Sequence, residues 1–340
     1  MSGPSAPQLR TRALELGPYL SARLGGDGSV ADARLAGEGM SDTTLLVDLR
    51  DGRELVLRAH STTVAGTGVE SPERHFAVLR AVHPVAGVPS PEPLLLESDP
   101  APLGAPFMII GRLPGRAVVP WSREGCAFLR STGAGPAGRE LLAILASIHA
   151  VDPAALAGAL DPPPAGTAAA AQAVARLRAA IERDRDGPEP ALTDALGWLE
   201  AHLPACAQPA LVHGDYRAGN LLFDGGHITG VLDWEFAHLG DPARDIAWLM
   251  AASNRVGDEL ACDMVPMGEV VERYEGLTGR AVDPAALTFW DLFMLVENAA
   301  LWVRTTASWR RGEVDDVRIA RWSYTLPRTR RLVLDALERT

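Results

Sequence analysis

An aspartate, an asparagine and a second aspartate stand at a spacing that suits phosphoryl transfer. Asp215 lies in the stretch His-Gly-Asp-Tyr-Arg-Ala-Gly-Asn, which ends at Asn220, and Asp233 follows the next apolar segments. A phosphoryl-transfer site needs a carboxylate near the attacking hydroxyl, oxygen ligands for the metal that bridges the phosphates, and positive charge on the phosphates. Amide and carboxylate oxygens suit magnesium. The three side chains therefore predict a magnesium-dependent site in which Asp215 faces the substrate.

The apolar segments 221–223 and 228–232 flank an Asp-Gly-Gly sequence at 224–226. This pattern predicts a β-hairpin, because glycine accepts the positive φ angles of a tight turn. The open end of the hairpin would bring Asn220, at its entrance, close to Asp233, at its exit. Taken singly, each of these residues would more often be a turn residue or a helix cap. Their combination with the hairpin and the preceding His-Gly favours a functional site.

Two polar residues near this site are predicted to have structural roles. We expect His213 to brace the loop through hydrogen bonds rather than to act as a base. Asp245 is expected to open a helix whose apolar face is formed by Ile246, Leu249 and Met250.

The second half of the chain resembles the aminoglycoside phosphotransferase family, within the protein-kinase-like fold. The family pattern is His-Gly-Asp-x-x-x-x-Asn, then an Asp in a short apolar strand, then Asp-x-Ala at a helix start, and residues 245–247 complete it. The words Asp-Trp-Glu at 233–235 and Leu-Gly-Asp-Pro at 239–242 are most similar to kinase-like domains fused to acyl-CoA dehydrogenases. The resemblance implies an α+β bilobal fold, with a small antiparallel-sheet N-lobe and a larger, mainly helical C-lobe.

The resemblance also implies roles for individual residues. Asp215 would be the catalytic base, and Arg217, in the same motif, is a second catalytic candidate. Asn220 and Asp233 would bind Mg²⁺, and Asp245 would support the catalytic loop. The implied cofactors are ATP or GTP together with Mg²⁺.

The positive charge that phosphates require must come from arginine. The sequence contains no lysine, so all 32 basic residues are arginines. Arg58 follows an apolar strand at the place where the family carries its basic residue, and its forked guanidinium can hold phosphate oxygens. The alternative is an arginine at a strand end that faces solvent.

The glycine-rich loop is expected within residues 35–44, with Gly39 and Ser41 as candidates for nucleotide contacts. Glu38 and Asp42 are acidic residues at the place where phosphates would lie. Either their side chains point away from the phosphates, or they weaken nucleotide binding.

A second departure from the family pattern concerns the ion pair of the basic strand residue. The family places a glutamate four residues before Leu79, but this sequence has His75 there. Glu73 or Glu70 could substitute if the helix is rotated, so the ion pair with Arg58 is an open question.

The apolar strand at 106–110 runs into a Gly/Pro exit and predicts the hinge between the lobes. If the resemblance holds, adenine pairs with the backbone near Ile109 and Gly111. The predicted domains are an N-lobe at 1–111, which binds the nucleotide, and a C-lobe at 112–340, which carries the catalytic loop, the metal site and the acceptor pocket.

Periodicity and turn signals predict further elements. They are a helix up to about residue 24 broken at Gly17-Pro18, a hairpin of strands 43–49 and 54–58, a helix at 71–81 capped by Ser71, and a buried helix at 140–149. Segments 131–138 and 161–171 are rich in Gly, Pro and Ala, and we expect mobile loops or poorly anchored ends there.

The segment 289–303 is apolar on all sides except for three polar residues. In the resembled family the late helices line the acceptor pocket, so Glu297 and Asn298 are candidates for substrate contacts. A carboxylate that is paired internally and holds helices together is an equally good interpretation.

Composition limits the choice of function classes. The hydrophobic share of 47% supports packed cores, and the net charge of −11 argues against a nucleic-acid partner. No signal peptide is recognised and no uninterrupted apolar run approaches a membrane span, so a cytoplasmic protein without a membrane partner, monomeric or homodimeric, is expected. The three cysteines are far apart and predict reduced thiols rather than disulfides or a metal site.

These observations favour a Mg²⁺- and nucleotide-dependent kinase that phosphorylates a hydroxyl of a small molecule. The acceptor could be an antibiotic such as an aminoglycoside or macrolide, a sugar, an amino alcohol or a hydroxyacyl thioester. The alternatives are a nucleotide-binding protein without turnover, which His75 and the acidic loop would favour, and a metal-dependent hydrolase that uses the same carboxylates.

Overall fold

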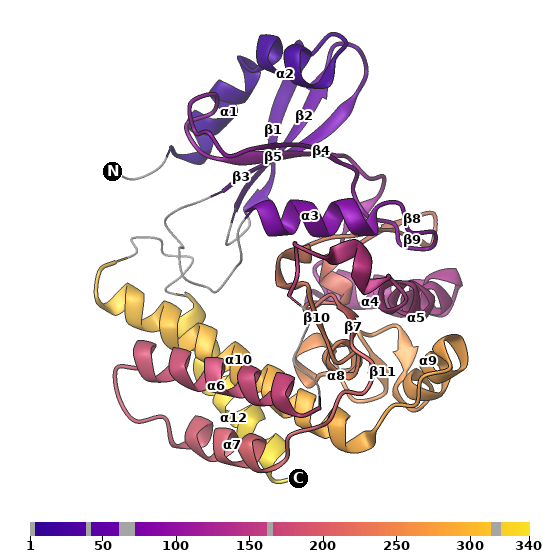
Figure 1. The fold of residues 1–340 in the computed structure, drawn as a ribbon, viewed down its shortest axis with the longest axis vertical. Coiled ribbons are helices and arrows are strands. Elements are labelled where there is room, and N and C mark those ends of the chain that lie inside the picture. Colours follow the sequence, from indigo (N-terminus) through magenta and orange to yellow (C-terminus); the bar gives the residue numbers. More distant parts are fainter. Residues whose placement is uncertain (1–3, 39–41, 61–71, 162–165, 314–320) are drawn as a thin grey trace. The chain divides into compact units, whose positions relative to one another are not determined.

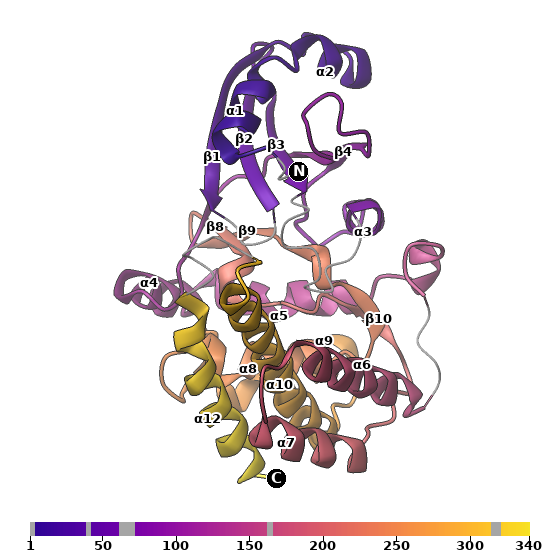
Figure 2. The same ribbon diagram turned by 90° about the vertical axis from the view of Figure 1, so that its left-hand side faces the viewer.

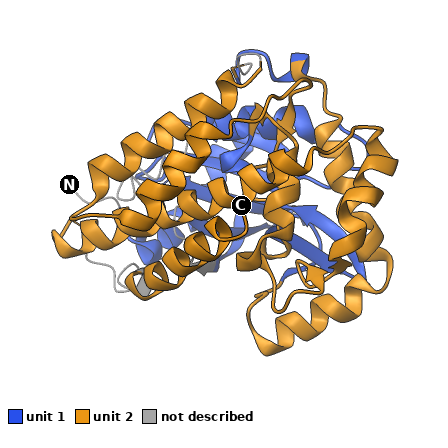
Figure 3. Cartoon of the chain, turned by 90° about the horizontal axis from the view of Figure 1, so that it is seen from below, with its two compact units in different colours: residues 1–117, 154–160, 220–237 blue, residues 118–153, 161–219, 238–340 orange. Residues whose placement is uncertain are grey.

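The computed structural model describes residues 4–38, 42–60, 72–161, 166–313 and 321–340. The chain forms two compact units (Figure 3). Unit 1 comprises residues 1–117, 154–160 and 220–237, and unit 2 comprises residues 118–153, 161–219 and 238–340. The predicted boundary at residue 111 lies near the end of the first stretch of unit 1, and the assignment of nucleotide and acceptor binding to separate lobes stays a prediction.

Unit 1 is built on an antiparallel sheet whose strands have the order β1-β2-β3-β5-β4 (Figure 1). The strands are β1 Val30–Glu38, β2 Asp42–Leu49, β3 Glu54–His60, β4 Pro93–Glu97 and β5 Phe107–Gly111. Burial alternates along β3, as expected for a strand with one face on a core. The predicted hairpin (β2 and β3) and the predicted strand (β5) are therefore confirmed.

The N-terminal helices pack on this sheet. They are α1 Ala6–Leu14 and α2 Gly17–Leu24 (Figure 2). The core they share with the sheet includes Leu9, Leu20 and Leu57. The predicted break lies at the start of α2, where Pro18 occupies the first turn because its missing N–H is not needed there. Helix α3 spans Pro72–Val82, and its expected cap Ser71 lies outside the described residues.

A second, smaller sheet in unit 1 carries the predicted hairpin. Its strands are β6 Arg116–Ala117, β8 Leu221–Asp224 and β9 His227–Val231 in the order β6-β8-β9. Gly225 and Gly226 have φ angles of 55° and 84°, so both turn residues use the left-handed region that a two-residue hairpin of this kind requires. The hairpin prediction is confirmed, including its turn.

Unit 2 is mainly helical. Its helices are α4 Arg123–Gly133, α5 Pro136–His149, α6 Ala168–Asp184, α7 Pro190–Ala201, α8 Ala243–Met250, α9 Val270–Thr278, α10 Pro284–Arg310 and α12 Thr325–Leu337. Two short strand pairs accompany them: β7 Ala210–Val212 with β10 His238–Gly240, and β11 Leu260–Ala261 with β12 Val265–Pro266. Short 3-10 turns include η2 Ala218–Asn220 and η3 Trp234–Phe236, which flank the hairpin in the sequence.

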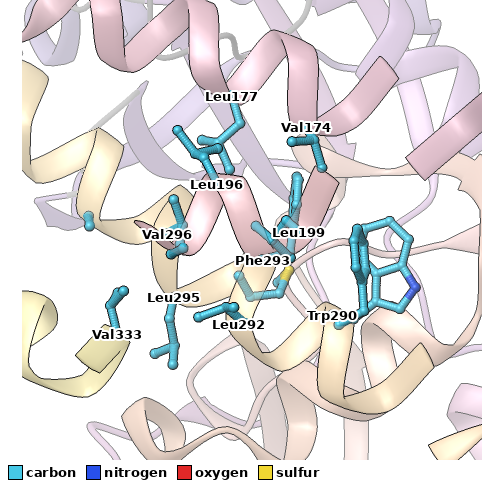
Figure 4. Packing of buried hydrophobic residues seen from close by; sticks show 14 of the residues in the cluster. Val174, Leu177, Leu196, Leu199, Trp290, Leu292, Phe293, Leu295, Val296 and Val333 are labelled. Carbon is cyan, nitrogen blue, oxygen red and sulfur yellow. The ribbon is translucent and has the colours of Figure 1, made fainter. Parts of the chain in front are cut away.

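Helix α10 is the centre of the largest helical core. Its apolar side chains meet those of α6, α7 and α12 in one cluster (Figure 4). This explains why the predicted segment 289–303 is apolar on all sides: helices cover several of its faces. By length and composition α10 could also span a membrane, although Asp291 and Glu297 interrupt its apolar sequence. In the structure, 61% of its most apolar window is buried inside the protein.

The expectation of poorly anchored ends at 131–138 is wrong. Helix α4 continues to Gly133 and α5 begins at Pro136, earlier than the predicted 140. The small residues allow close packing here: a Cβ on Gly138 would lie 1.9 Å from the carbonyl oxygen of Gly133. Of segment 161–171, residues 162–165 lie outside the described part, and Ala170 in α6 is buried in the core. Gly133, Gly138 and Ala170 are packing residues rather than signs of weak anchoring.

Candidate functional site

The catalytic-loop motif of unit 2 is held by a buried aspartate on α8. Asp245 accepts hydrogen bonds from the backbone N–H of His213 (2.7 Å) and of Gly214 (2.9 Å). His149, at the end of α5, lies 3.1 Å from the same carboxylate through Nε2. Because an ionised carboxylate only accepts, His149 donates from Nε2, and its Nδ1 can accept from the Tyr274 hydroxyl at 2.7 Å. The predicted supporting role of Asp245 is therefore seen in the structure.

The charge of Asp245 is stabilised where it is buried. Burial by itself would raise the pKa of this carboxyl group, but the hydrogen bond from His149, the neighbouring imidazoles and the backbone N–H of His213 outweigh it and lower the pKa. The folded state therefore favours the carboxylate form that the loop requires.

We expect Asp245→Asn to lower the free energy of unfolding at pH 7 by about 3–5 kcal/mol, because it breaks a buried network on one side. The pKa of the Asp245 carboxyl group is lower in the folded state than in the unfolded state. Its contribution to the free energy of unfolding is therefore complete at pH values above the unfolded-state pKa, and it is lost as the pH falls through the folded-state pKa. The difference between wild type and variant in urea unfolding should therefore shrink below about pH 4. A difference that is unchanged down to pH 3 would contradict the charged network.

Asp215 is held by two side-chain donors. Its Oδ1 accepts from Trp248 Nε1 at 2.7 Å and from Arg217 Nε at 2.9 Å. Its own backbone N–H donates to His213 Nδ1 at 3.2 Å, so His213 braces the loop as predicted. The structure thus brings the two predicted catalytic residues, Asp215 and Arg217, into direct contact. Trp248 was not predicted from the sequence, because its contact with Asp215 depends on the packing of α8 against the loop.

The two predicted metal ligands meet at the open end of the hairpin in unit 1. Leu232 N donates to the carbonyl oxygen of Asn220 at 2.9 Å, directly before Asp233. Asn220 is buried, whereas the Asp233 side chain is 44% exposed. Asp233 also has a left-handed backbone, with φ and ψ both 59°, a conformation that Asp tolerates and that is concentrated at functional sites.

The donor set fits magnesium better than a metal that is held by protein alone. Among the described residues, no group of three His, Cys, Asp or Glu side chains gathers as a metal site. Magnesium is usually held by one or two carboxylates plus phosphate oxygens and water. One carboxylate (Asp233) and one amide (Asn220) therefore fit a Mg²⁺–nucleotide complex.

Arg58 lies in β3 and points toward the hairpin end. Its Nη1 is 3.2 Å from Asp233 Oδ1, and its Nη2 is 3.8 Å from Glu235 Oε2. Its side chain is only 11% exposed, which excludes the alternative of a solvent-facing arginine. Asp233 and Glu235, which both follow the hairpin, are thus among the acidic partners of Arg58. On α3, Glu73 accepts a hydrogen bond from Ser98 Oγ at 2.8 Å, and His75 is buried. Glu70 lies outside the described residues, so the predicted ion pair of Arg58 with Glu73 or Glu70 stays a prediction.

The other predicted nucleotide contacts are only partly described. Gly39 and Ser41 lie outside the described residues. Ile109 is fully buried in β5, and Gly111 N donates to the carbonyl oxygen of Glu92 at 2.8 Å, so this amide is used within the sheet. The pairing of adenine with this segment stays a prediction.

Glu297 is paired inside unit 2. Its Oε2 lies 2.8 Å from Arg244 Nη2, which links α10 to α8, and the Arg244 guanidinium lies over the rings of Phe293 (5.1 Å) and Trp290 (5.7 Å). The structure therefore has the internally paired carboxylate that was the alternative interpretation. Substrate contacts of Glu297 and of its neighbour Asn298 stay predictions.

The comparisons with known proteins agree with this geometry. The model of the family described as "Phosphotransferase enzyme family" matches residues 32–279. Acyl-CoA dehydrogenase family member 10 of Mus musculus is 32% identical over 62% of this chain but only 19% of its own length. Probable acyl-CoA dehydrogenase IBR3 of Arabidopsis thaliana is 26% identical over 81% of this chain and 36% of its own length. The chain thus spans roughly a fifth to a third of these curated relatives.

Solved structures share the fold at low sequence identity. A candidate aminoglycoside phosphotransferase from Ralstonia eutropha JMP134 matches with a TM-score of 0.73 and 20% identity, covering 95% of this chain and 97% of that chain. The GDP and kanamycin complex of APH(2'')-IIIa matches with a TM-score of 0.64 and 16% identity, covering 96% and 99%. The fold is therefore the α+β kinase-like fold, with an antiparallel sheet followed by a mainly helical region, as the resemblance implied.

Proposed function

Because the chain belongs to the Phosphotransferase enzyme family, we propose that it is a Mg²⁺-dependent kinase that uses ATP or GTP to phosphorylate a hydroxyl of a small molecule. The observation that carries the proposal is the fixed carboxylate of Asp215, which lies on an anchored loop five residues before Asn220. A base and a metal ligand on one short stretch of chain are what phosphoryl transfer requires.

Each residue has a distinct task in this proposal. Asp215 orients the acceptor hydroxyl and takes its proton, and Arg217 holds the carboxylate. Asn220 and Asp233 would hold Mg²⁺, which when bound neutralises charge on the phosphates. Arg58 would contact the phosphates with its fork of N–H donors, because the sequence has no lysine for this task.

The named relatives and structural neighbours suggest more than one class of acceptor. The named complexes of structural neighbours contain kanamycin in APH(2'')-IIIa and hygromycin B in APH(4)-Ia, whereas the curated relatives are acyl-CoA dehydrogenase family members. Glu297 is already paired with Arg244, and a paired carboxylate attracts a cation less than a free one. Sugars, amino alcohols and hydroxyacyl thioesters therefore belong in the screen beside antibiotics.

The proposal is tested by a thermal-shift screen of ATP, GTP and hydroxylated small molecules, each with and without Mg²⁺. Hits are incubated with the nucleotide, and mass spectrometry looks for an added phosphate. We expect transfer to at least one acceptor, absent with Asp215→Asn. Nucleotide binding without transfer across the panel would favour a binding protein without turnover. Phosphate release that needs metal but no nucleotide would favour a hydrolase.

Arg58 provides a separate prediction. Arg58→Ala should weaken ATP binding by about tenfold or more, the usual range for losing hydrogen bonds to a charged group, and should lower turnover with it. Arg58→Lys keeps the charge but loses the fork, so partial activity is expected. Titration with ATP at fixed Mg²⁺ measures the first effect, and Arg34→Ala, which removes an arginine paired with Asp48 in the same sheet, is the control. Unchanged ATP affinity in Arg58→Ala would remove Arg58 from the phosphate site.

A further inference from the structure

Helix α8 presents two side chains to the catalytic loop. Asp245 and Trp248 are three residues apart, which places them on the same face of the helix. Asp245 binds the backbone of the loop at His213 and Gly214, whereas Trp248 binds the side chain of Asp215. One helical turn thus fixes both the path of the loop and the direction of its carboxylate.

The indole of Trp248 is a fixed donor. The residue is 6% exposed, and it belongs to the core cluster formed with α6, α7, α10 and α12. A buried indole N–H needs a hydrogen-bond partner, and here the partner is Asp215 Oδ1 at 2.7 Å. The ring cannot swing away from Asp215 without opening the core. Arg217, the other donor, is more exposed, at 25% of its side chain, so it is the more easily displaced of the two.

Trp248 and Arg217 both donate to Oδ1 of Asp215. Because the indole is fixed in the core, its hydrogen bond restricts rotation of the carboxylate about the bond that joins it to Cβ. The orientation of the carboxylate determines whether it can reach the proton of an acceptor hydroxyl.

We propose that Trp248 is a positioning residue for phosphoryl transfer, which holds Oδ1 of Asp215 and so fixes the orientation in which the carboxylate takes the proton of the acceptor hydroxyl. This rests on the function proposed above. In the transfer step the O–H bond of the acceptor breaks and its proton goes to the Asp215 carboxylate. The acceptor oxygen bonds to the γ-phosphorus, and the bond from that phosphorus to the β–γ bridging oxygen breaks to release the nucleoside diphosphate.

The hydrogen bond can be tested without turnover. The chain has eight tryptophans, so ¹⁵N-tryptophan labelling gives a simple set of indole N–H signals. Trp248→Phe should remove one signal and thereby assign it. Asp215→Asn should move that signal, because the charged acceptor becomes a neutral amide, and should move the Trp290 signal little, since Trp290 Nε1 donates to Asp241 instead. A Trp248 signal that does not respond to Asp215→Asn would overturn the proposal.

The kinetic test uses Mg²⁺–ATP with water as the phosphoryl acceptor and measures phosphate release. Trp248→Phe keeps an aromatic ring in the core but removes the donor, so kcat should fall by about tenfold while the KM for ATP stays within about twofold. In the Asp215→Asn background the same change should have little further effect, because the tryptophan acts through the carboxylate. A purely structural tryptophan would give the same loss in both backgrounds.

Trp290→Phe is the matched control. Trp290 is buried in the same core cluster and also donates Nε1 to an aspartate, Asp241, at 2.9 Å. It should lower the melting temperature about as much as Trp248→Phe but leave kcat within about twofold. If Trp248→Phe turns over as fast as the wild type, the positioning role is overturned but the proposed function is not. Wild-type phosphate release no faster than that of Asp215→Asn, with no transfer to any acceptor, would overturn the proposed function and the positioning role together.

Discussion

Asp215→Asn is expected to lower kcat by roughly two to four orders of magnitude, the range for the loss of a general base. The asparagine side chain has the same shape, and its carbonyl oxygen can still accept from Trp248 and Arg217 at the place of Oδ1. What it cannot do is take the acceptor's proton. ATP affinity should hardly change, because the proposed metal and phosphate contacts are made by other residues. Single-turnover kinetics and an ATP titration separate the two effects.

The control for this variant is Asp194→Asn, an exposed position on α7. It makes the same chemical change in unit 2 away from the catalytic-loop motif and should leave kcat unchanged. Circular dichroism and the melting temperature establish that both variants fold. Near wild-type turnover in folded Asp215→Asn would remove Asp215 from the role of base.

The hairpin shows which parts of such a site can be predicted from sequence. Asn220 and Asp233 are joined by a segment whose conformation is almost wholly local: two short apolar strands and a turn with two glycines at positive φ. A local pattern fixes register, and register fixes which residues meet at the open end. The same reasoning succeeded for β2 and β3, which are also joined by a short turn. Close approach of the two ligands at the backbone was therefore predictable, although their binding of Mg²⁺ is untested.

The missed contacts depend on tertiary structure. Trp248 reaches Asp215 only because α8 lies against the loop after β7, and no local pattern encodes that distance. Glu235 and Arg58 are far apart in sequence and meet through the packing of the hairpin near β3. Glu70, one of the two carboxylates that could replace the family's glutamate, lies outside the described residues, so its pairing with Arg58 stays a prediction. The contacts of Arg58 with Asp233 and Glu235 were not predicted, because they depend on where the hairpin packs.

The small residues were misread for a related reason. Gly133 and Gly138 look like loop residues when they are considered alone, because glycine weakens an isolated helix. In the fold they allow backbones to approach: a Cβ on Gly133 would lie 2.5 Å from the carbonyl oxygen of Met264. The benefit of a missing side chain is visible only when the neighbour is known.

Asp233→Asn should remove most of the Mg²⁺-dependent stabilisation by ATP while the protein still folds. At a ligand concentration of 100 times Kd, a site that binds only the folded state stabilises it by about 2.7 kcal/mol, and most of this should disappear when the charged ligand is lost. Asparagine is the better substitution than alanine, because Asp233 has a φ of 59° and asparagine tolerates that backbone. Asp224→Asn is the matched control, since Asp224 is an exposed aspartate at the opposite end of the same hairpin. The measurement is the shift in melting temperature with ATP, with and without Mg²⁺. Equal Mg²⁺-dependent shifts in Asp233→Asn and wild type would show that Asp233 serves the hairpin and not the metal, and the proposed kinase would then need another carboxylate.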